Sequence, residues 1–372
     1  WTEWTPGSGK MPQVWLSGHY GFRWGHESFN TDETYRAHAI EFLRQLTVPG
    51  VYEVGGLGAC TLISRKAIEH GVSFGCVKNV DYWGEDRHFC IRATVLGIGL
   101  YVDTHYPAYH IYRESDLVGV EEYRLRVKGD MTLHSTKHKA SGNKLTLSMI
   151  VHNEAERYLR QVLEHARQYI DNAVIIDDAS TDDTVKICRE ALAGIPLTII
   201  ELKHPLFKTE NILRKIQWEE TIKTNPDWIL SLDADEIFED RLMEEIQSLI
   251  NQDQFDVFYF RLYDFWDQNH YREDTYWQAH NSYRPLLVRY IPDYEYVWKE
   301  TALHCGRLPL NITALPGAAS SLRIKHLGWA QPADREAKYK RYMESDPEGK
   351  YGIMEQYQSI LDPEPNLVKW EE

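Results

Sequence analysis

The protein has 372 residues, with 41 basic and 56 acidic side chains and a formal net charge of −15 at pH 7. That acidic balance argues against a nucleic-acid partner held on a basic face. No apolar run approaches the roughly 18 residues of a membrane span, and no charged-then-apolar leader opens the chain, so we expect a soluble protein.

The five cysteines are widely spaced and form no Cys-x-x-Cys pair. An odd number without such pairs favours a reducing compartment over a disulfide framework, so the sequence predicts a cytoplasmic protein.

The first 36 residues are rich in Trp, Gly and His and show no clear periodicity. A short helix is expected over residues 39–46, and strand and turn over 51–63. A helix then follows Gly84, with Glu85 and Asp86 in its first turn, where the helix dipole stabilises negative charge. Helix capping is the ordinary explanation of those two acids. A strand is expected at residues 99–103, and His110 follows it.

Residues 126–143 are polar, basic and poor in apolar side chains, which predicts a linker. From residue 145 strand and helix alternate, an arrangement that favours a mostly parallel sheet with helices on both faces. The expected strands are 145–151, 173–176, 197–202, 228–232 and 255–263. The expected helices are 159–166, 185–193 (with Ser180 and Asp183 as a near capping box), 212–222, 242–250 and 334–343. Residues 264–322 look irregular.

Two of these strands end in acids, at Asp177-Asp178 and at Asp233-Ala-Asp235. A doubly wound sheet brings such strand ends to one crevice. In extended backbone Asp233 and Asp235 would leave the same side of the strand and converge on one cation. Hard oxygen ligands suit Mg²⁺ or Mn²⁺ shared with a substrate phosphate. Arg214, on the preceding helix, could grip the same phosphates, or it could be an ordinary exposed helix residue.

Four motifs carry a resemblance to a known family: residues 149–154 (MIVHNE), 176–184 (IDDASTDDT), 232–236 (LDADE) and 325–328 (KHLG). On these motifs, residues 144–345 resemble a family 2 glycosyltransferase domain of the Rossmann-like GT-A fold. The resemblance implies a nucleotide-diphosphate sugar donor, Mg²⁺ or Mn²⁺, and inversion at the anomeric carbon.

The same resemblance implies roles for single residues. Asn153, Glu154, Asp177 and Asp178 would lie beside the nucleoside. Asp233 and Asp235 would lie at the ribose, the phosphates and the metal, and His326 would be a late metal ligand.

The sequence departs from the family pattern at one place. Related domains often carry a His-Glu pair about twenty residues before the final histidine, and here His304 is followed by Cys305. Glu300 and His304 therefore remain as alternative candidates for the base that deprotonates the acceptor.

Residues 1–125 resemble, more weakly, the acceptor-side half of a second GT-A-like domain. The resemblance implies Asp86 as an acceptor base and His110 as a metal ligand whose Asp-x-Asp partners are missing from the chain. The predicted organisation is thus a partial unit (1–125), a linker (126–143), a complete domain (144–345) and a C-terminal extension (346–372).

The function expected from the sequence is an inverting, metal-dependent glycosyltransferase of a bacterial polysaccharide pathway. It would transfer a sugar to a saccharide or to a lipid-linked acceptor, with no nucleic-acid partner and at most peripheral membrane association. The alternative is a noncatalytic sugar- or partner-binding protein on the same scaffold, favoured by Cys305. Nucleotidyl transfer is disfavoured because the first strand of the domain is not followed by a glycine-rich basic loop.

Overall fold

The structure is a computed structural model that describes residues 14–15, 41–58, 60–78, 84–105, 107–111, 117, 119–126, 139–301, 305–348 and 353–372. The chain divides into two compact units. Unit 1 comprises residues 1–128 with 313–318, and unit 2 comprises residues 129–312 with 319–372.

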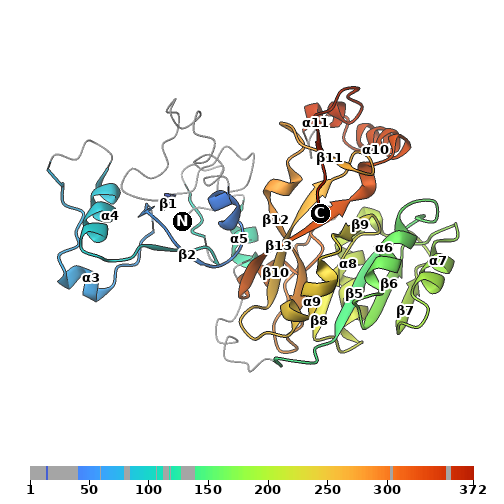
Figure 1. Ribbon diagram of the computed structural model, residues 1–372, viewed down its shortest axis with the longest axis horizontal. Coiled ribbons are helices and arrows are strands. Elements are labelled where there is room, and N and C mark those ends of the chain that lie inside the picture. The colour runs from blue at the N-terminus through green and yellow to red at the C-terminus, as the bar shows by residue number, and fades with distance from the viewer. Residues whose placement is uncertain are drawn as a thin grey trace. The chain divides into compact units, whose positions relative to one another are not determined.

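Unit 1 is small and built from short elements (Figure 1). Its strands pair antiparallel in twos, β1 (Val14–Trp15) with β3 (Gly56–Leu57) and β2 (Val51–Glu53) with β4 (Tyr101–Asp103). Its helices are α3 (Arg65–Glu69), α4 (Glu85–Val95) and α5 (Val120–Arg126). Phe42, Phe89 and Ala93 are buried in one apolar cluster. The predicted helix after Gly84 and the strand near residue 101 are confirmed.

Unit 2 is built on an eight-stranded sheet in the order β7-β6-β5-β8-β12-β10-β13-β9. Four neighbouring strands run parallel, β7 (Leu197–Glu201), β6 (Asn172–Asp177), β5 (Leu145–Val151) and β8 (Trp228–Ser231). The others are β12 (Tyr283–Arg289), β10 (Val257–Asp264), β13 (Gly317–His326) and β9 (Glu236–Phe238), with β12 antiparallel to β8 and β10, and β13 antiparallel to β9. The predicted α/β fold class is confirmed.

Helices α6 (Leu159–Ala166), α7 (Thr184–Ala191) and α8 (Glu210–Ile222) alternate with the parallel strands of unit 2. Helices α9 (Leu242–Ile250), α10 (Pro332–Ser345) and α11 (Met354–Ser359) come after the last parallel strand in the chain. Short 3₁₀ turns occur at η3 (Phe207–Thr209), η4 (Ala279–Asn281), η5 (Leu310–Ala314) and η6 (Leu327–Trp329).

The prediction of irregular structure over residues 264–322 is wrong, because β12, β13 and β11 (His270–Arg272) lie wholly or mostly there. The aromatic residues of this region are strand formers, and tertiary packing decides which of them pair. Strand β11 pairs antiparallel with β14 (Leu367–Lys369) near the end of the chain.

The predicted capping box at Ser180 and Asp183 is also wrong. Asp183 is the N-cap of α7, but its side chain makes no capping hydrogen bond. The backbone N–H of Ser180 instead donates to Asp177, at 3.1 Å from Oδ2, within the loop that follows β6. Ser180 is thereby tied to the strand end, and it is Asp182 that accepts from the N–H of Thr184, the first residue of α7, at 3.0 Å.

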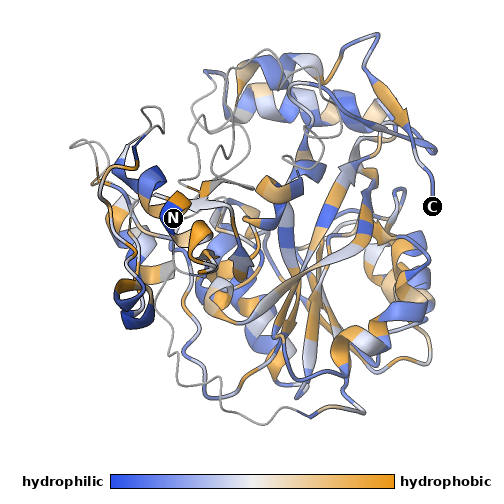
Figure 2. Cartoon of the chain, turned by 60° about the vertical axis from the view of Figure 1, so that its left-hand side comes forward, coloured by the Kyte–Doolittle hydropathy of each residue, from blue (hydrophilic) through white to orange (hydrophobic). Residues whose placement is uncertain are grey.

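The central strands are buried on both faces, which is the condition of parallel strands covered by helices. Leu145, Leu147 and Met149 of β5 have no exposed surface, and Figure 2 shows hydrophobic residues concentrated along the strands of the sheet. Helix α8 covers part of the sheet, where Leu213 packs with Val174 and Ile176. Among the described residues, no helix is both long and apolar enough to cross a membrane.

Leu213→Ala should destabilise the protein by about 2–5 kcal/mol, since it leaves a cavity between α8 and the sheet. Urea denaturation of the purified variant measures this. The neighbouring Ile212 is 47% exposed, so Ile212→Ala is the matched control and should change stability by no more than about 0.5 kcal/mol. Equal losses in the two variants would contradict the packing described here.

Candidate functional site

The acids that follow β8 lie in a turn between β8 and β9. The strand ends at Ser231, and the N–H of Glu236 donates to the carbonyl of Asp233 at 3.1 Å. The N–H of Asp233 in turn donates to the Glu236 carboxylate at 3.0 Å. The expectation that Asp233 and Asp235 extend from one side of a strand is therefore wrong, because the turn sends their carboxylates to different partners.

Arg307 neutralises two of these acids. Its guanidinium donates to both oxygens of Glu236, at 2.5 and 2.7 Å, and lies 2.8 Å from Asp233 Oδ2. The Glu236 carboxylate is 1% exposed. Burial would raise its pKa, but Arg307 outweighs burial and holds the pKa of Glu236 below its usual value. A bidentate Arg–carboxylate pair of this kind fixes geometry as well as charge.

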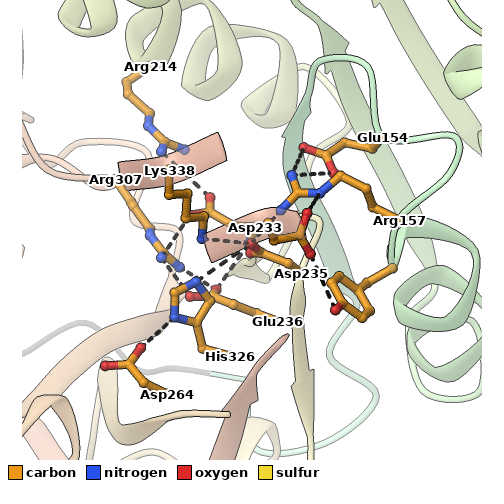
Figure 3. A network of polar contacts seen from close by, with 12 residues as sticks. Glu154, Arg157, Arg214, Asp233, Asp235, Glu236, Asp264, Arg307, His326 and Lys338 are labelled. Atoms are coloured by element: carbon orange, nitrogen blue, oxygen red, sulfur yellow. Dashed lines mark hydrogen bonds and ion pairs between the residues drawn. The ribbon is translucent and has the colours of Figure 1, made fainter. Parts of the chain in front are cut away.

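Asp235 is surrounded by three cations from three other segments (Figure 3). Its Oδ2 lies 3.6 Å from His326 Nε2, 3.8 Å from Lys338 Nζ and 3.9 Å from an Arg157 nitrogen. Burial favours the neutral acid, but His326 and the other cations outweigh it and hold the pKa of Asp235 far below its ordinary range. The group is thus a carboxylate at any physiological pH.

His326 is held between two carboxylates. Its Nδ1 lies 2.6 Å from Asp264 Oδ1, while Nε2 faces Asp235. Burial lowers the pKa of His326, but Asp235 and Asp264 together raise it to about 9. A histidine with one nitrogen on a buried carboxylate and the other directed into a site has the orientation of a metal ligand with its supporting group.

The surroundings of Gly328 provide a test of whether a divalent cation would fit. A Cβ on Gly328 would stand 2.2 Å from Asp235 Oδ2, 2.4 Å from Lys338 Nζ and 3.0 Å from His326 Nε2. A side chain at position 328 would collide with these groups, so glycine is what lets Asp235, Lys338 and His326 come together against the backbone. Two ligands side by side on Mg²⁺ or Mn²⁺ would be roughly 3 Å apart, close to the observed 3.6 Å between Asp235 and His326. The donor set fits such an ion if a substrate supplies further oxygens.

The four predicted metal ligands do not form a complete cluster. No group of three or more His, Cys, Asp or Glu arranged to hold a metal occurs in the part of the chain that the structure describes. Asp235 and His326 come together, whereas Asp233 faces Arg307 and Arg214. His110 is exposed and belongs to unit 1.

A second carboxylate cluster borders Asp235 through Arg157. This arginine donates to both oxygens of Glu154, at 3.1 and 3.0 Å, and to Asp334 at 3.2 Å. Burial raises the pKa of Glu154 to about 7, although Arg157 acts in the opposite direction. Tyr158 donates a longer hydrogen bond, 3.4 Å, to the same Asp334. Residues at the end of β5 are thereby connected to α10.

The loops after β5 and β6 hold each other. Asn153, in the left-handed region at φ 54°, accepts a hydrogen bond from the Thr181 N–H at 2.8 Å. Asp178 is 1% exposed and accepts from the N–H groups of Leu206 and Phe207, at 2.5 and 3.1 Å. These contacts bring the predicted nucleoside-binding residues to one end of the parallel strands, where α/β sheets bind their ligands.

The structure also locates the other predicted site residues. Arg214 is buried rather than exposed, 3.6 Å from Asp233 Oδ1 and 3.4 Å from Glu210. Glu300 is exposed and 2.6 Å from Lys215, which lowers its pKa. His304 lies outside the described residues. Asp86 is in the first turn of α4, as predicted, and accepts from the N–H of Arg87 at 2.8 Å.

Sequence reasoning missed several residues that complete the site. Arg157 follows the MIVHNE motif by three residues, and Lys338 lies in the charged helix, so both stood close to features that were noticed. Glu236 and Gly328 belong to the LDADE and KHLG motifs, and Asp334 begins the same charged helix. Nothing in the local sequence distinguishes Asp264 and Arg307, which the fold alone brings to the site. The missed residues are Arg157, Glu236, Asp264, Arg307, Gly328, Asp334 and Lys338.

Charged side chains gathered at the carboxyl ends of parallel strands are typical of nucleotide-binding α/β domains. Residues 146–304 match the model of the family described as "Glycosyl transferase family 2". The chain therefore contains a family 2 glycosyltransferase domain.

Among curated proteins, an uncharacterized glycosyltransferase of Rickettsia felis is 29% identical over 122 residues, 32% of this chain and 39% of that protein. Uncharacterized proteins of Mycobacterium bovis and Mycobacterium tuberculosis are 24% identical over 227 residues, 58% of this chain and 54% of each. The chain thus spans about half, or less, of the length of these relatives.

Similar solved structures include TarS 1–349 of S. aureus, at 15% identity and a TM-score of 0.35, over 59% of this chain and 69% of that one. Another is glucosyl-3-phosphoglycerate synthase of Mycobacterium tuberculosis with Mn²⁺, UDP and glucosyl-3-phosphoglycerate. It is 13% identical with a TM-score of 0.24, over 33% of this chain and 44% of that one.

Arg307→Met should destabilise the protein by about 3–5 kcal/mol, because Glu236 would remain buried without a partner. Adding Glu236→Gln should recover part of that loss, since the unpaired charge is removed. Urea denaturation of both variants measures the difference, with exposed Arg341→Met as the control arginine. A double variant no more stable than Arg307→Met would argue against the pairing.

Glu154 should make stability fall as pH rises. Its pKa is about 7 in the folded state and near 4.5 unfolded, so the folded state holds the extra proton between these values. From pH 4.5 to 7.5 the wild type should lose roughly 1–3 kcal/mol more than Glu154→Gln. Denaturant titrations with chelator present measure this, and parallel pH curves for the two proteins would refute it.

Proposed function

We propose that unit 2 is an inverting, metal-dependent glycosyltransferase that uses a nucleotide-diphosphate sugar. The observation that supports this most directly is the arrangement in which His326 lies between Asp235 and Asp264, both of which belong to the residues that match the family 2 model. Its position at the ends of parallel strands suits a diphosphate between a nucleoside and a sugar.

The nucleoside would bind at the loops after β5 and β6. Asn153 and Asp178 lie on these loops and Asp177 ends β6. Their side chains accept hydrogen bonds from the backbone N–H groups of Thr181, Leu206 and Ser180 respectively, which preorganises the loops before a ligand arrives. Glu154 borders the same loops and is anchored by Arg157. Preorganised polar groups bind a ligand with less ordering cost than mobile ones.

The diphosphate would bind beside the turn at Asp233–Glu236. A divalent cation held by Asp235 and His326 would supply charge stabilisation to the departing diphosphate. His326 must release its Nε2 proton to act as a ligand. Its Nδ1–H would still donate to Asp264, which fixes the orientation of the ring. Arg307 holds Glu236, and Glu236 holds the backbone of Asp233, so this pair fixes the turn on which Asp235 stands.

The acceptor hydroxyl would attack the anomeric carbon from the face opposite the diphosphate, which inverts the configuration. The base that takes its proton stays a choice between Glu300 and His304. Lys215 lowers the pKa of Glu300, and a carboxylate with a lowered pKa is a weaker base. That consideration favours His304, and comparison of Glu300→Gln with His304→Gln would separate the two.

The acceptor itself is proposed to be a saccharide or a lipid-linked saccharide, in a bacterial polysaccharide pathway and at a cytoplasmic location. Unit 1, with Asp86 at the start of α4, is proposed as the acceptor-side half of a second GT-A-like domain. The competing function is noncatalytic binding, favoured by Cys305 in place of a glutamate.

Asp235→Asn should abolish sugar transfer, because one metal ligand loses its charge and the stabilisation of several kcal/mol corresponds to a hundredfold loss or more. Donors are first identified by calorimetry of nucleotide-diphosphate sugars with Mn²⁺ and Mg²⁺. Transfer or donor hydrolysis is then measured for wild type, Asp235→Asn and the exposed control Asp253→Asn.

The outcomes separate the two functions. Wild-type turnover that EDTA removes and Mn²⁺ or Mg²⁺ restores, and that Asp235→Asn lacks, supports the transferase. Tight donor binding without turnover over a broad acceptor panel supports noncatalytic binding. Full activity in Asp235→Asn would remove the assigned role of this carboxylate.

A further inference from the structure

The three cations around Asp235 are close to it without touching it. Their nitrogens stand 3.6–3.9 Å from the same oxygen, Oδ2. Hydrogen bonds from N–H to oxygen typically span 2.7–3.2 Å. The cations therefore surround the carboxylate at the distance of ion pairs, and two of them, Lys338 and His326, also lie against Gly328.

Two of these cations are committed to other carboxylates. Arg157 also binds Glu154 and Asp334, and His326 also binds Asp264. Lys338 differs, because its ion pair with Asp235 is its one carboxylate contact within 4 Å among the described residues. Its other neighbour is the ring of Trp329, whose centroid lies 4.2 Å from Nζ.

The position of Lys338 is also confined. Its side chain is 13% exposed, and burial lowers the pKa of its ammonium group although Asp235 acts to raise it. A buried ammonium group needs an anion, and its four-carbon stem allows the group to change partners without movement of the helix. The aromatic face of Trp329 would stay beside the ammonium during such an exchange.

We propose that Lys338 is a diphosphate-binding residue whose ammonium group is the counter-ion of Asp235 only until a divalent cation takes that place. When the cation pairs with Asp235, Lys338 loses its carboxylate partner and turns to the oxygens of the diphosphate. The inference rests on the proposed function and adds a residue of α10 to the recognition of the donor.

A purely structural role for Lys338 makes different predictions. If the lysine served only to neutralise Asp235 in the fold, its removal would lower stability and leave diphosphate affinity unchanged. If the exchange occurs, removal should weaken diphosphate binding and strengthen binding of the metal alone, since Asp235 is then free of its competitor.

The test uses calorimetry on Lys338→Met, Lys338→Gln and Lys338→Arg, with exposed Lys340→Met on the same helix as the control. The probes are Mg²⁺ alone, methylenediphosphonate with Mg²⁺, and nucleoside diphosphates with Mg²⁺. Loss of a charged hydrogen bond should raise the Kd for both anions about tenfold or more in Lys338→Met and Lys338→Gln. Mg²⁺ alone should bind more tightly to these two variants, whereas Lys338→Arg and Lys340→Met should stay within about threefold of wild type. Thermal melts identify any variant that fails to fold. If one of the two neutral variants fails, the Kd values of the other one test the inference.

The inference is overturned if a folded neutral variant binds the anions as tightly as wild type, or if wild type binds neither anion. Its failure is distinct from that of the proposed function. Wild type that binds methylenediphosphonate through Lys338 but no nucleoside diphosphate would support the inference and contradict the nucleotide-sugar donor.

Discussion

The site depends on the neutralisation of three carboxylates in one short turn between β8 and β9. Asp233, Asp235 and Glu236 follow one another within four residues, and two of them are largely buried. Buried charge is tolerated only when it is paired. Cationic side chains from other segments must therefore lie beside this turn, and this requirement constrains where those segments pack.

Those cations come from segments that are far apart in the chain. Arg157 precedes α6, Arg214 lies on α8, Arg307 follows Cys305, His326 ends β13 and Lys338 lies on α10. Each of these side chains connects its own segment to the turn. The ion pairs that stabilise the fold are therefore the same ones that surround the proposed ligand site. Three cationic side chains surround the single carboxylate of Asp235, so the site carries excess positive charge. An anionic diphosphate, bound with its metal, would neutralise that excess.

The sequence predicted the parallel half of the sheet well, since alternating strands and amphipathic helices have strong periodicity. Because it located the ends of those strands, it also located the acids that follow them. It failed for β12, which contains a proline, for β13, whose first half is small and polar, and for the capping box at Ser180. It also placed Asp233 and Asp235 on extended backbone, whereas hydrogen bonds to Glu236 close a turn there.

By itself the sequence determined the α/β class, the family 2 resemblance and the acids on which a donor site would be built, because these features are local and follow the order of the chain. Only the tertiary structure decided which cations face which acids. Arg307 on Glu236, Asp264 on His326 and Lys338 beside Asp235 are contacts between residues that lie 71, 62 and 103 positions apart in the chain. Long-range charge pairing is set by packing geometry, which local sequence patterns do not encode.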